Sequence, residues 1–201
     1  MAAEIRVVPA NEVSCRDLMA VFGQRGPAAG CYCQRYSLAP GEAFSKFPRQ
    51  ERAERLRAQT NCGNPQATRT SGLVAYLGDE PVGWCAVEPR PAFFGLLRVY
   101  RLPWEGRDED RNDPDIWAVT CVLVRAGHRK RGVAYALAEA AVDHARRNGA
   151  RALEAYPMRV ETGCVSWDEI HVGVESIFAA AGMTEVTRPG KRRLVMRIDF
   201  D

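Results

Sequence analysis

Apolar and polar positions along the 201-residue chain follow two spacings that alternate from one segment to the next. Short β-branched or aromatic runs indicate strands, and apolar residues three or four positions apart indicate helices. Strands are predicted at Ile5–Val8, Leu73–Leu77, Val82–Val87, Trp117–Val124, Ala152–Tyr156, Thr184–Thr187 and Arg193–Phe200. Helices are predicted at Val13–Phe22, Pro48–Gln59, Val133–Asn148 and Val174–Ala181. The order β-α-α-β-β-β-α-β-α-β-β predicts an α/β (α+β) fold, a mixed sheet with flanking helices, in a single domain over residues 1–201.

Three segments lack either spacing, and we expect them to be irregular: residues 26–41, 89–114 and 160–173. Connections of this length in a compact domain usually shape a binding site. The first contains the tripeptide Cys31-Tyr32-Cys33 and Tyr36. The second is acidic from residue 105 to 115, which would attract a cationic substrate or would only keep the loop soluble.

Composition narrows the class of protein. Apolar residues make up 46% and charged residues 26%, as in ordinary folded proteins, and the net charge of +3 is too small for general attraction to nucleic acid or an anionic membrane. The chain has no apolar run long enough to span a membrane and no export signal at its start, so a cytoplasmic location is expected. Its seven cysteines are therefore expected to be reduced, without structural disulfides. Cys31 and Cys33 lack a second ligand pair at zinc spacing, so no metal is expected.

A basic segment, residues 125–132, lies between the most apolar predicted strand and the helix predicted from Val133. The first N–H groups of a helix are unpaired and carry partial positive charge, so a phosphate can bind there. Gly132 and Ala134 leave this backbone uncovered, and Arg129, Lys130 and Arg131 add formal positive charge. The alternative is a solvated helix flank beside a turn glycine. The apolar strand before it and the amphipathic helix after it favour a site for a polyphosphate ligand.

The motif Arg129-x-x-Gly132-x-Ala134 after a strand resembles the acyl-CoA-binding signature of the GNAT superfamily, the Gcn5-related N-acetyltransferases. The helix ending in Gly182-Met183 and the hairpin at residues 73–87 resemble further parts of that fold, and the Cys31–Cys33 motif is similar to one in bacterial GNAT proteins. GNAT proteins vary for substrate in the region between the first two helices, so the resemblance implies that this motif and Tyr36 line an acceptor pocket. The resemblance implies a GNAT-like, mostly antiparallel central sheet and acetyl-CoA as co-substrate. The residues that it implies for CoA binding are Val122, Leu123, Val124, Arg129, Lys130, Arg131, Gly132, Val133 and Ala134.

The sequence departs from the family where protons are handled. Ala118 stands where many relatives have a glutamate base, and Phe178 where many have a tyrosine acid. The candidates that remain for proton transfer are Asp115, Glu88, Tyr156 and His171. Each also has a structural interpretation: a turn residue, a solvated strand end, a buried hydrogen-bonded ring and a loop histidine. Cys121 is interpreted as a packing residue of its strand.

Two functions are compatible with these observations. The first is an acyl-CoA-dependent N-acyltransferase that passes the acyl group, acetyl by expectation, directly to an amine of a small molecule or peptide. The second is a GNAT-fold protein that binds CoA in a regulatory role with little catalysis. Nucleic acid and membranes are not expected as partners because only one basic cluster is present. A homodimer is an expectation from the family resemblance.

Overall fold

The computed structural model describes residues 4–98, 102–160 and 170–201. Within them one sheet contains strands β1 (Ile5–Pro9), β2 (Gly72–Leu77), β3 (Glu80–Pro89), β4 (Ile116–Val124), β5 (Ala152–Ala155), β6 (Thr184–Thr187) and β7 (Val195–Asp199). The strand order is β1-β2-β3-β4-β5-β7-β6. Strands β4 and β5 are parallel and every other neighbouring pair is antiparallel. The predicted mixed, mostly antiparallel sheet is confirmed.

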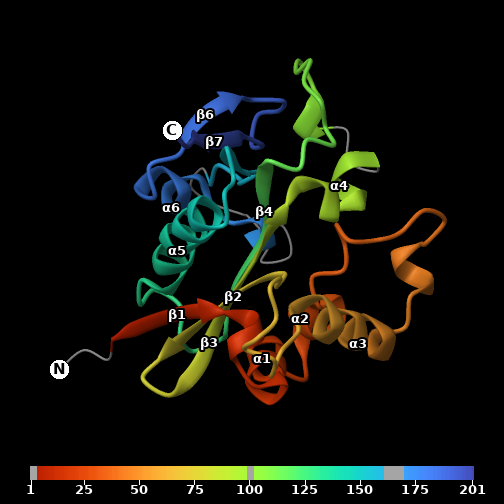
Figure 1. The fold of residues 1–201 in the computed structure, drawn as a ribbon, viewed down its shortest axis with the longest axis vertical. Helices are drawn as coiled ribbons and strands as arrows, with labels where there is room; N and C mark the ends of the chain where they lie inside the picture. The colour runs from red at the N-terminus through yellow and green to blue at the C-terminus, as the bar shows by residue number, and fades with distance from the viewer. Residues whose placement is uncertain (1–3, 99–101, 161–169) are drawn as a thin grey trace.

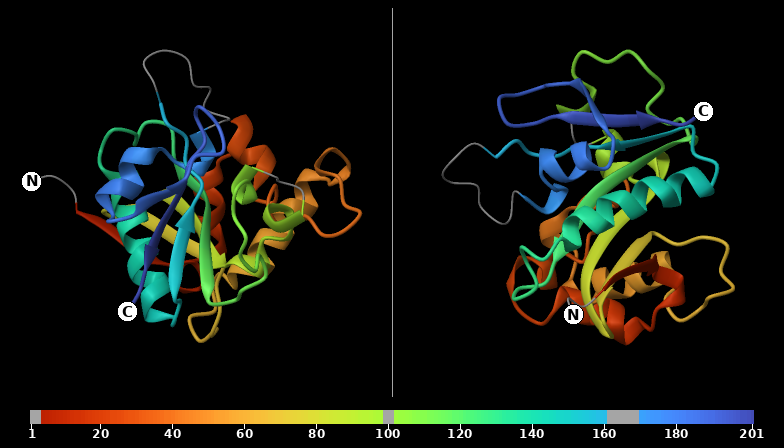
Figure 2. Two further views of the ribbon diagram at one scale, coloured as in Figure 1. Left: turned by 90° about the horizontal axis from the view of Figure 1, so that it is seen from above. Right: turned by 90° about the vertical axis from the view of Figure 1, so that its left-hand side faces the viewer.

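Helices cover both faces of this sheet (Figures 1 and 2). Their bounds are α1 (Cys15–Phe22), α2 (Gly26–Cys31), α3 (Arg49–Thr60), α4 (Phe94–Arg98), α5 (Val133–Arg147) and α6 (Glu175–Ala180). One core cluster joins α5 and α6 to their face of the sheet, and a second joins α1, part of the segment after it and α3 to the opposite face. The helices therefore form two layers separated by the sheet.

Two of the segments expected to be irregular contain short helices. Residues 26–31 form α2, and residues 94–98 form α4, where Leu96 and Leu97 are buried. The Trp104 indole N–H donates to the Leu96 carbonyl at 2.9 Å, which closes this segment on itself. Residues 26–31 read GPAAGC and residues 94–98 read FGLLR, and neither stretch repeats apolar residues over a full helical period, so spacing does not predict them. Residues 161–169 of the third segment lie outside the described residues.

Strand β4 separates from β5 halfway along its length. It pairs with β5 only over Ile116–Val119, opposite Ala152–Ala155, and from there to Val124 no described residue pairs with its backbone on that side. On its other side β4 stays paired with β3, with an irregularity at Thr120 that inserts one extra residue. Beyond β5 the chain continues through Tyr156 to Pro157, which has no N–H to donate to a ladder. An opening therefore forms beside the second half of β4.

A buried carboxylate, Glu154 on β5, holds the long loop of residues 102–115 against the sheet. It accepts hydrogen bonds from Arg90, Arg107 and Arg197, and from the Tyr156 hydroxyl at 2.9 Å. Burial alone would raise the pKa of Glu154, but the hydrogen bond and charge of Arg107 and the charge of Arg90 outweigh it and lower that pKa. Arg90 also donates to the Arg111 carbonyl, so the loop is fixed from the interior.

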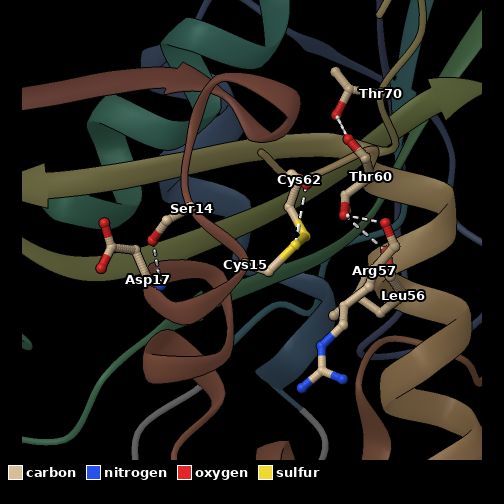
Figure 3. The surroundings of a disulfide bond; sticks show 8 residues. All are labelled: Ser14, Cys15, Asp17, Leu56, Arg57, Thr60, Cys62 and Thr70. Atoms are coloured by element: carbon tan, nitrogen blue, oxygen red, sulfur yellow. Dashed lines mark hydrogen bonds between the residues drawn. A yellow bond between two sulfur atoms is a disulfide. The ribbon is translucent and has the colours of Figure 1, made fainter. Parts of the chain in front are cut away.

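The expectation that no disulfide forms is wrong. Cys15 at the start of α1 and Cys62 just after α3 form a disulfide with a Cα–Cα distance of 5.0 Å (Figure 3). The backbones meet there because Gly63 N–H donates to the Val13 carbonyl at 2.7 Å. The pairing joins residues 47 positions apart, and such a contact depends on tertiary packing that local sequence patterns do not report. Cys31, Cys33, Cys85 and Cys121 are free thiols, and Cys164 lies outside the described residues.

Removing this cross-link should destabilise the fold. We expect the free energy of unfolding of the Cys15→Ser/Cys62→Ser variant to fall by about 2–4 kcal/mol, because its unfolded chain regains the freedom of a long loop. Denaturant titration without reductant measures the change. Dithiothreitol should lower the stability of the wild type to that of the variant and leave the variant unchanged. A denatured, unreduced wild type that titrates with all seven thiols would contradict the disulfide.

Candidate active site

A cavity of about 670 Å³ opens where β4 leaves β5. Strand β4 contributes Cys121, Val122, Leu123 and Val124. The loop before α5 and the start of α5 contribute His128, Arg129, Lys130, Gly132, Val133, Ala134 and Tyr135, and the α6 side contributes His171, Gly173, Val174 and Ile177. The opposite wall comes from residues 22–52, with Phe22, Ala28, Gly30, Cys31, Cys33, Arg35, Tyr36, Phe44 and Arg52. The cavity therefore has walls from the helical layers on both sides of the sheet.

Alternation along β4 explains how one cavity reaches both layers. Successive side chains of a strand point to opposite faces. Val122 and Val124 pack with the α5 layer, whereas Cys121 and Leu123 pack with the α1–α3 layer. The backbone edge between them is the part of β4 that has no partner in β5. A ligand lying along this edge would meet both layers.

The start of α5 is open to a ligand. Gly132 is the N-cap with φ +82°, and no side chain caps the first N–H groups of the helix. Arg129, Lys130 and Arg131 are exposed around this helix start. Arg129 and Lys130 line the cavity, whereas Arg131 is not among its described lining residues. Eight of the nine residues predicted to bind CoA thus lie on the wall of one cavity. Their role in binding CoA stays a prediction.

Contacts with β3 position the basic loop before α5. Arg125 donates to Glu80 at 3.0 Å and to the Pro81 carbonyl at 2.7 Å. The His128 Nε2 atom lies 3.3 Å from the same Glu80 carboxylate. Because Glu80 belongs to β3, these contacts fasten the loop to the sheet and fix where α5 begins.

The structure places the four candidates for proton transfer in different surroundings. His171 lines the cavity, with its ring 6.1 Å from the Tyr36 ring. Asp115 is exposed in the turn before β4, away from the lining residues. Tyr156 is buried and donates to Glu154, and burial, followed by the Glu154 charge, raises the pKa of its hydroxyl. The Tyr156 hydroxyl therefore belongs to the buried ion cluster.

Glu88, the fourth candidate, lies directly across the β3–β4 ladder from Ala118. Ala118 is the position at which the family resemblance leads one to expect a glutamate, so this chain has its carboxylate one strand away. Burial raises the pKa of Glu88 to about 7, and a hydrogen bond with Ser71 partly opposes the rise. Ala86, two residues before Glu88, pairs with Cys121 on the cavity wall. Two residues along a strand span about 7 Å, which a short water chain can bridge. The cross-strand register that reveals this relation cannot be read from the sequence.

Three free thiols, Cys31, Cys33 and Cys121, meet at the cavity wall. The Trp84 indole N–H donates to the Cys33 sulfur at 2.9 Å. Burial, and then the neighbouring Cys121, raise the pKa values of Cys31 and Cys33. These two thiols consequently keep their protons at neutral pH and are poor nucleophiles. Among the described residues no group of three or more His, Cys, Asp or Glu side chains is arranged to hold a metal ion.

Sequence patterns did not single out the wall formed by Arg35, Phe44 and Arg52. The guanidinium carbon of Arg52 lies 4.3 Å from the centroid of the Phe44 ring, and that of Arg35 lies 5.4 Å from it. Tyr36, which we interpreted as part of an acceptor pocket, lines the cavity with them. The many charged residues of α3 predict a solvent-exposed helix, so the local sequence does not indicate that Arg52 lines a cavity.

Comparison with known proteins agrees with this geometry. The model of the acetyltransferase (GNAT) family matches residues 36–161, more than half of the chain, and the protein belongs to that family. The structure is similar to that of YncA, a putative acetyltransferase from Salmonella typhimurium solved with its cofactor acetyl-CoA, with TM-score 0.53, 15% identity and coverage of 100% of this chain and 95% of that one. No curated protein sequence gives a significant match.

Two further structures have the same fold. A GCN5-related N-acetyltransferase from Kribbella flavida gives a TM-score of 0.51 at 18% identity and covers 98% of each chain. The GNAT domain of PAT from S. lividans gives a TM-score of 0.51 at 19% identity, covering 98% of this chain and 90% of that one. Family membership makes acetyl-CoA the co-substrate and acyl transfer the general activity. None of the described helices could span a membrane.

Proposed function

We propose that the protein transfers an acetyl group from acetyl-CoA directly to an amine of a small molecule or peptide. The observation that carries this proposal is the opening between β4 and β5 beside the uncapped start of α5, which forms one cavity with walls from both layers. The donor enters from the α5 side and the acceptor from the α1–α3 side, so that they meet at the edge of β4.

The donor half of the cavity suits CoA. N–H groups from Arg129 to Ala134 point to a diphosphate in this proposal, with positive charge from Arg129 and Lys130 beside them. The edge of β4 beyond Val119, which pairs with none of the residues that the structure describes, offers backbone donors and acceptors to the pantetheine amides, as a neighbouring strand would. Gly132 adds no side chain at the point where the backbone must approach the ligand closely.

Acyl transfer at the β4 edge requires that the two substrates be held together and that one proton be removed from the amine. The amine nitrogen attacks the thioester carbon, the new C–N bond forms, the C–S bond breaks, and CoA leaves as its thiol. Backbone N–H groups of β4 can polarise the carbonyl, and the barrier falls further because both substrates are held together. The raised pKa values of the Cys31 and Cys33 thiols support direct transfer rather than an acyl-enzyme on either of them.

Glu88 is the base that we assign, acting through water. Its pKa of about 7 lets it be ionised in part at neutral pH and still bind a proton well, which is the favourable range for a general base. His171, on the cavity wall itself, is the second candidate.

The alternative of a CoA-binding protein without turnover is favoured by one observation. Ala118 and Phe178 occupy the positions of the usual proton-handling residues, and both are fully buried in the core. Release of CoASH from acetyl-CoA across a panel of amines decides between the two. We expect product with at least one amine class. Tight acetyl-CoA binding with no product from any amine would establish the binding protein instead.

Replacing Gly132 should weaken the donor site specifically. Gly132→Val puts a branched side chain at the start of α5, and we expect acetyl-CoA affinity, measured by calorimetry, to fall at least about tenfold. Gly149→Val is the matched control, because Gly149 follows the other end of α5 and has a similar φ of +78°. Both variants carry the same type of backbone strain, so equal acetyl-CoA affinity in the two would contradict the assignment.

The pH dependence of kcat/KM should show the ionisation of Glu88. We expect kcat/KM of the wild type to rise with pH through about 7, and Glu88→Gln to lose about 100-fold in kcat and this pH limb. The exposed Glu139→Gln on α5 should leave the profile unchanged. The raised pKa also means that folding stability falls as pH rises from the ordinary carboxyl range through about 7, so unfolding is followed at each pH. A limb that persists in Glu88→Gln and disappears in His171→Gln would transfer the role to His171.

A further inference from the structure

The cavity is lined by positive charge and, in the described part of the chain, by no carboxylate. Its lining includes Arg35, Arg52, Arg129 and Lys130 but neither Asp nor Glu. Arg129 and Lys130 lie at the donor end beside α5, whereas Arg35 and Arg52 belong to the opposite wall. The charge of the donor end matches the phosphates of CoA, so the charge of the opposite wall requires a different explanation.

Arg52 is the middle of three arginines at three-residue spacing on α3. Arg49, before it, donates to the Gln24 carbonyl at 3.2 Å, and Arg55, after it, pairs with Glu42 at 2.6 Å. The Arg52 side chain has no hydrogen bond or ion pair to any described residue, and its Nε atom is buried without a partner. A buried donor without a partner is costly to maintain, and an anionic ligand at this place would satisfy it.

Arg35 is held next to Arg52 by a shared aromatic ring. Both guanidinium groups lie against Phe44, Arg52 at 4.3 Å and Arg35 at 5.4 Å from the ring centroid. Cation–π contact orients the two guanidinium groups but leaves their N–H donors available. Within the described residues Arg35 also has no carboxylate partner. Two like charges beside one ring form an arrangement that an oxyanion stabilises, since guanidinium forks match carboxylate and phosphate oxygens.

The acidic loop does not offset this charge at the cavity. None of residues 105–115 lines it in the described structure. Glu109 instead pairs with Arg197 at 3.3 Å, and Asp113 pairs with Arg151 at 2.5 Å. Glu109 and Asp113 of the acidic loop are therefore engaged with arginines elsewhere on the molecule.

We propose that the acceptor is an amine that also carries an oxyanion, such as the carboxylate of an amino acid, and that Arg52 and Arg35 bind this group against Phe44. This inference rests on the proposed function. Tyr36, Phe22 and Phe44 would contact the apolar body of the acceptor. The oxyanion and the amine then occupy opposite ends of the acceptor half, with the amine at Cys121 on the β4 edge.

Matched acceptors test the proposal. The comparison pairs each amino acid with its amide and with the amine that lacks the carboxyl group, for example phenylalanine, phenylalaninamide and phenethylamine. We expect the wild type to prefer the carboxylate member by at least about tenfold in kcat/KM. Arg52→Gln should remove this preference by raising KM for the carboxylate acceptor about 10- to 100-fold, with little change for the amide. Arg52→Lys should restore part of it, and Arg35→Gln should have a smaller effect of the same kind.

The control variant is Arg57→Gln, an exposed α3 residue outside the cavity lining, which should change neither acceptor preference nor acetyl-CoA affinity. Thermal unfolding shows whether each variant folds. A wild type that prefers the amide or the plain amine would overturn the proposal. So would a loss of acetyl-CoA affinity in Arg52→Gln with unchanged acceptor preference, because the arginines would then bind a phosphate of CoA.

Binding without turnover separates this inference from the proposed function. Calorimetry with amino acids in the presence of CoASH measures the acceptor half even if no product forms. Amino acid binding that Arg52→Gln abolishes would support the inference although the enzyme proposal had failed. Absence of both binding and turnover would overturn the inference as well.

Discussion

The separation of β4 from β5 is the constraint on which the rest of the site depends. Four residue pairs hold the two parallel strands together, and beyond them the backbone of β4 pairs with no described residue on that side. Met158, just past Pro157, bridges to Val174 and Arg193, which directs the chain away from β4. Unpaired backbone in a protein interior needs polar partners. The N–H and C=O groups along this edge of β4 therefore need hydrogen-bond partners. An extended ligand that contains amides can supply them without any specialised side chain of the protein.

The net charge of each region depends on which arginines are paired with carboxylates. Arg90, Arg107 and Arg197 surround Glu154 and also neutralise Glu109, so the acidic loop is attached to the sheet by its own carboxylates and carbonyls. On α3, by contrast, Arg52 remains unpaired among described residues while its neighbours are engaged. A small net charge of +3 therefore conceals a strongly basic interior cavity. Overall charge excludes some partner classes but says little about the electrostatics of one site.

Local spacing was sufficient for the sheet, for α5 and for the family resemblance. The predicted strand at Trp117–Val124 and helix at Val133–Asn148 differ by one residue from β4 and α5, because their apolar periods are long and regular. The Cys15–Cys62 disulfide, the position of Glu88 across from Ala118, and the meeting of Arg35, Phe44 and Arg52 all depend on long-range contacts. Apolar spacing within one segment does not report contacts between distant segments, so the basic motif before α5 was visible in the sequence and the cavity wall of Arg35, Phe44 and Arg52 was not.

The disulfide between Cys15 and Cys62 closes a single excursion of chain that carries the whole α1–α3 wall, from Phe22 to Arg52. The excursion leaves the sheet after β1 and returns to it before β2, and most of its first half precedes the stretch matched by the family model. Under the proposed function, this closed segment contacts the acceptor, whereas the β4 edge and the start of α5 contact the donor. Substitutions within the segment would then change the choice of acceptor and leave the donor site intact.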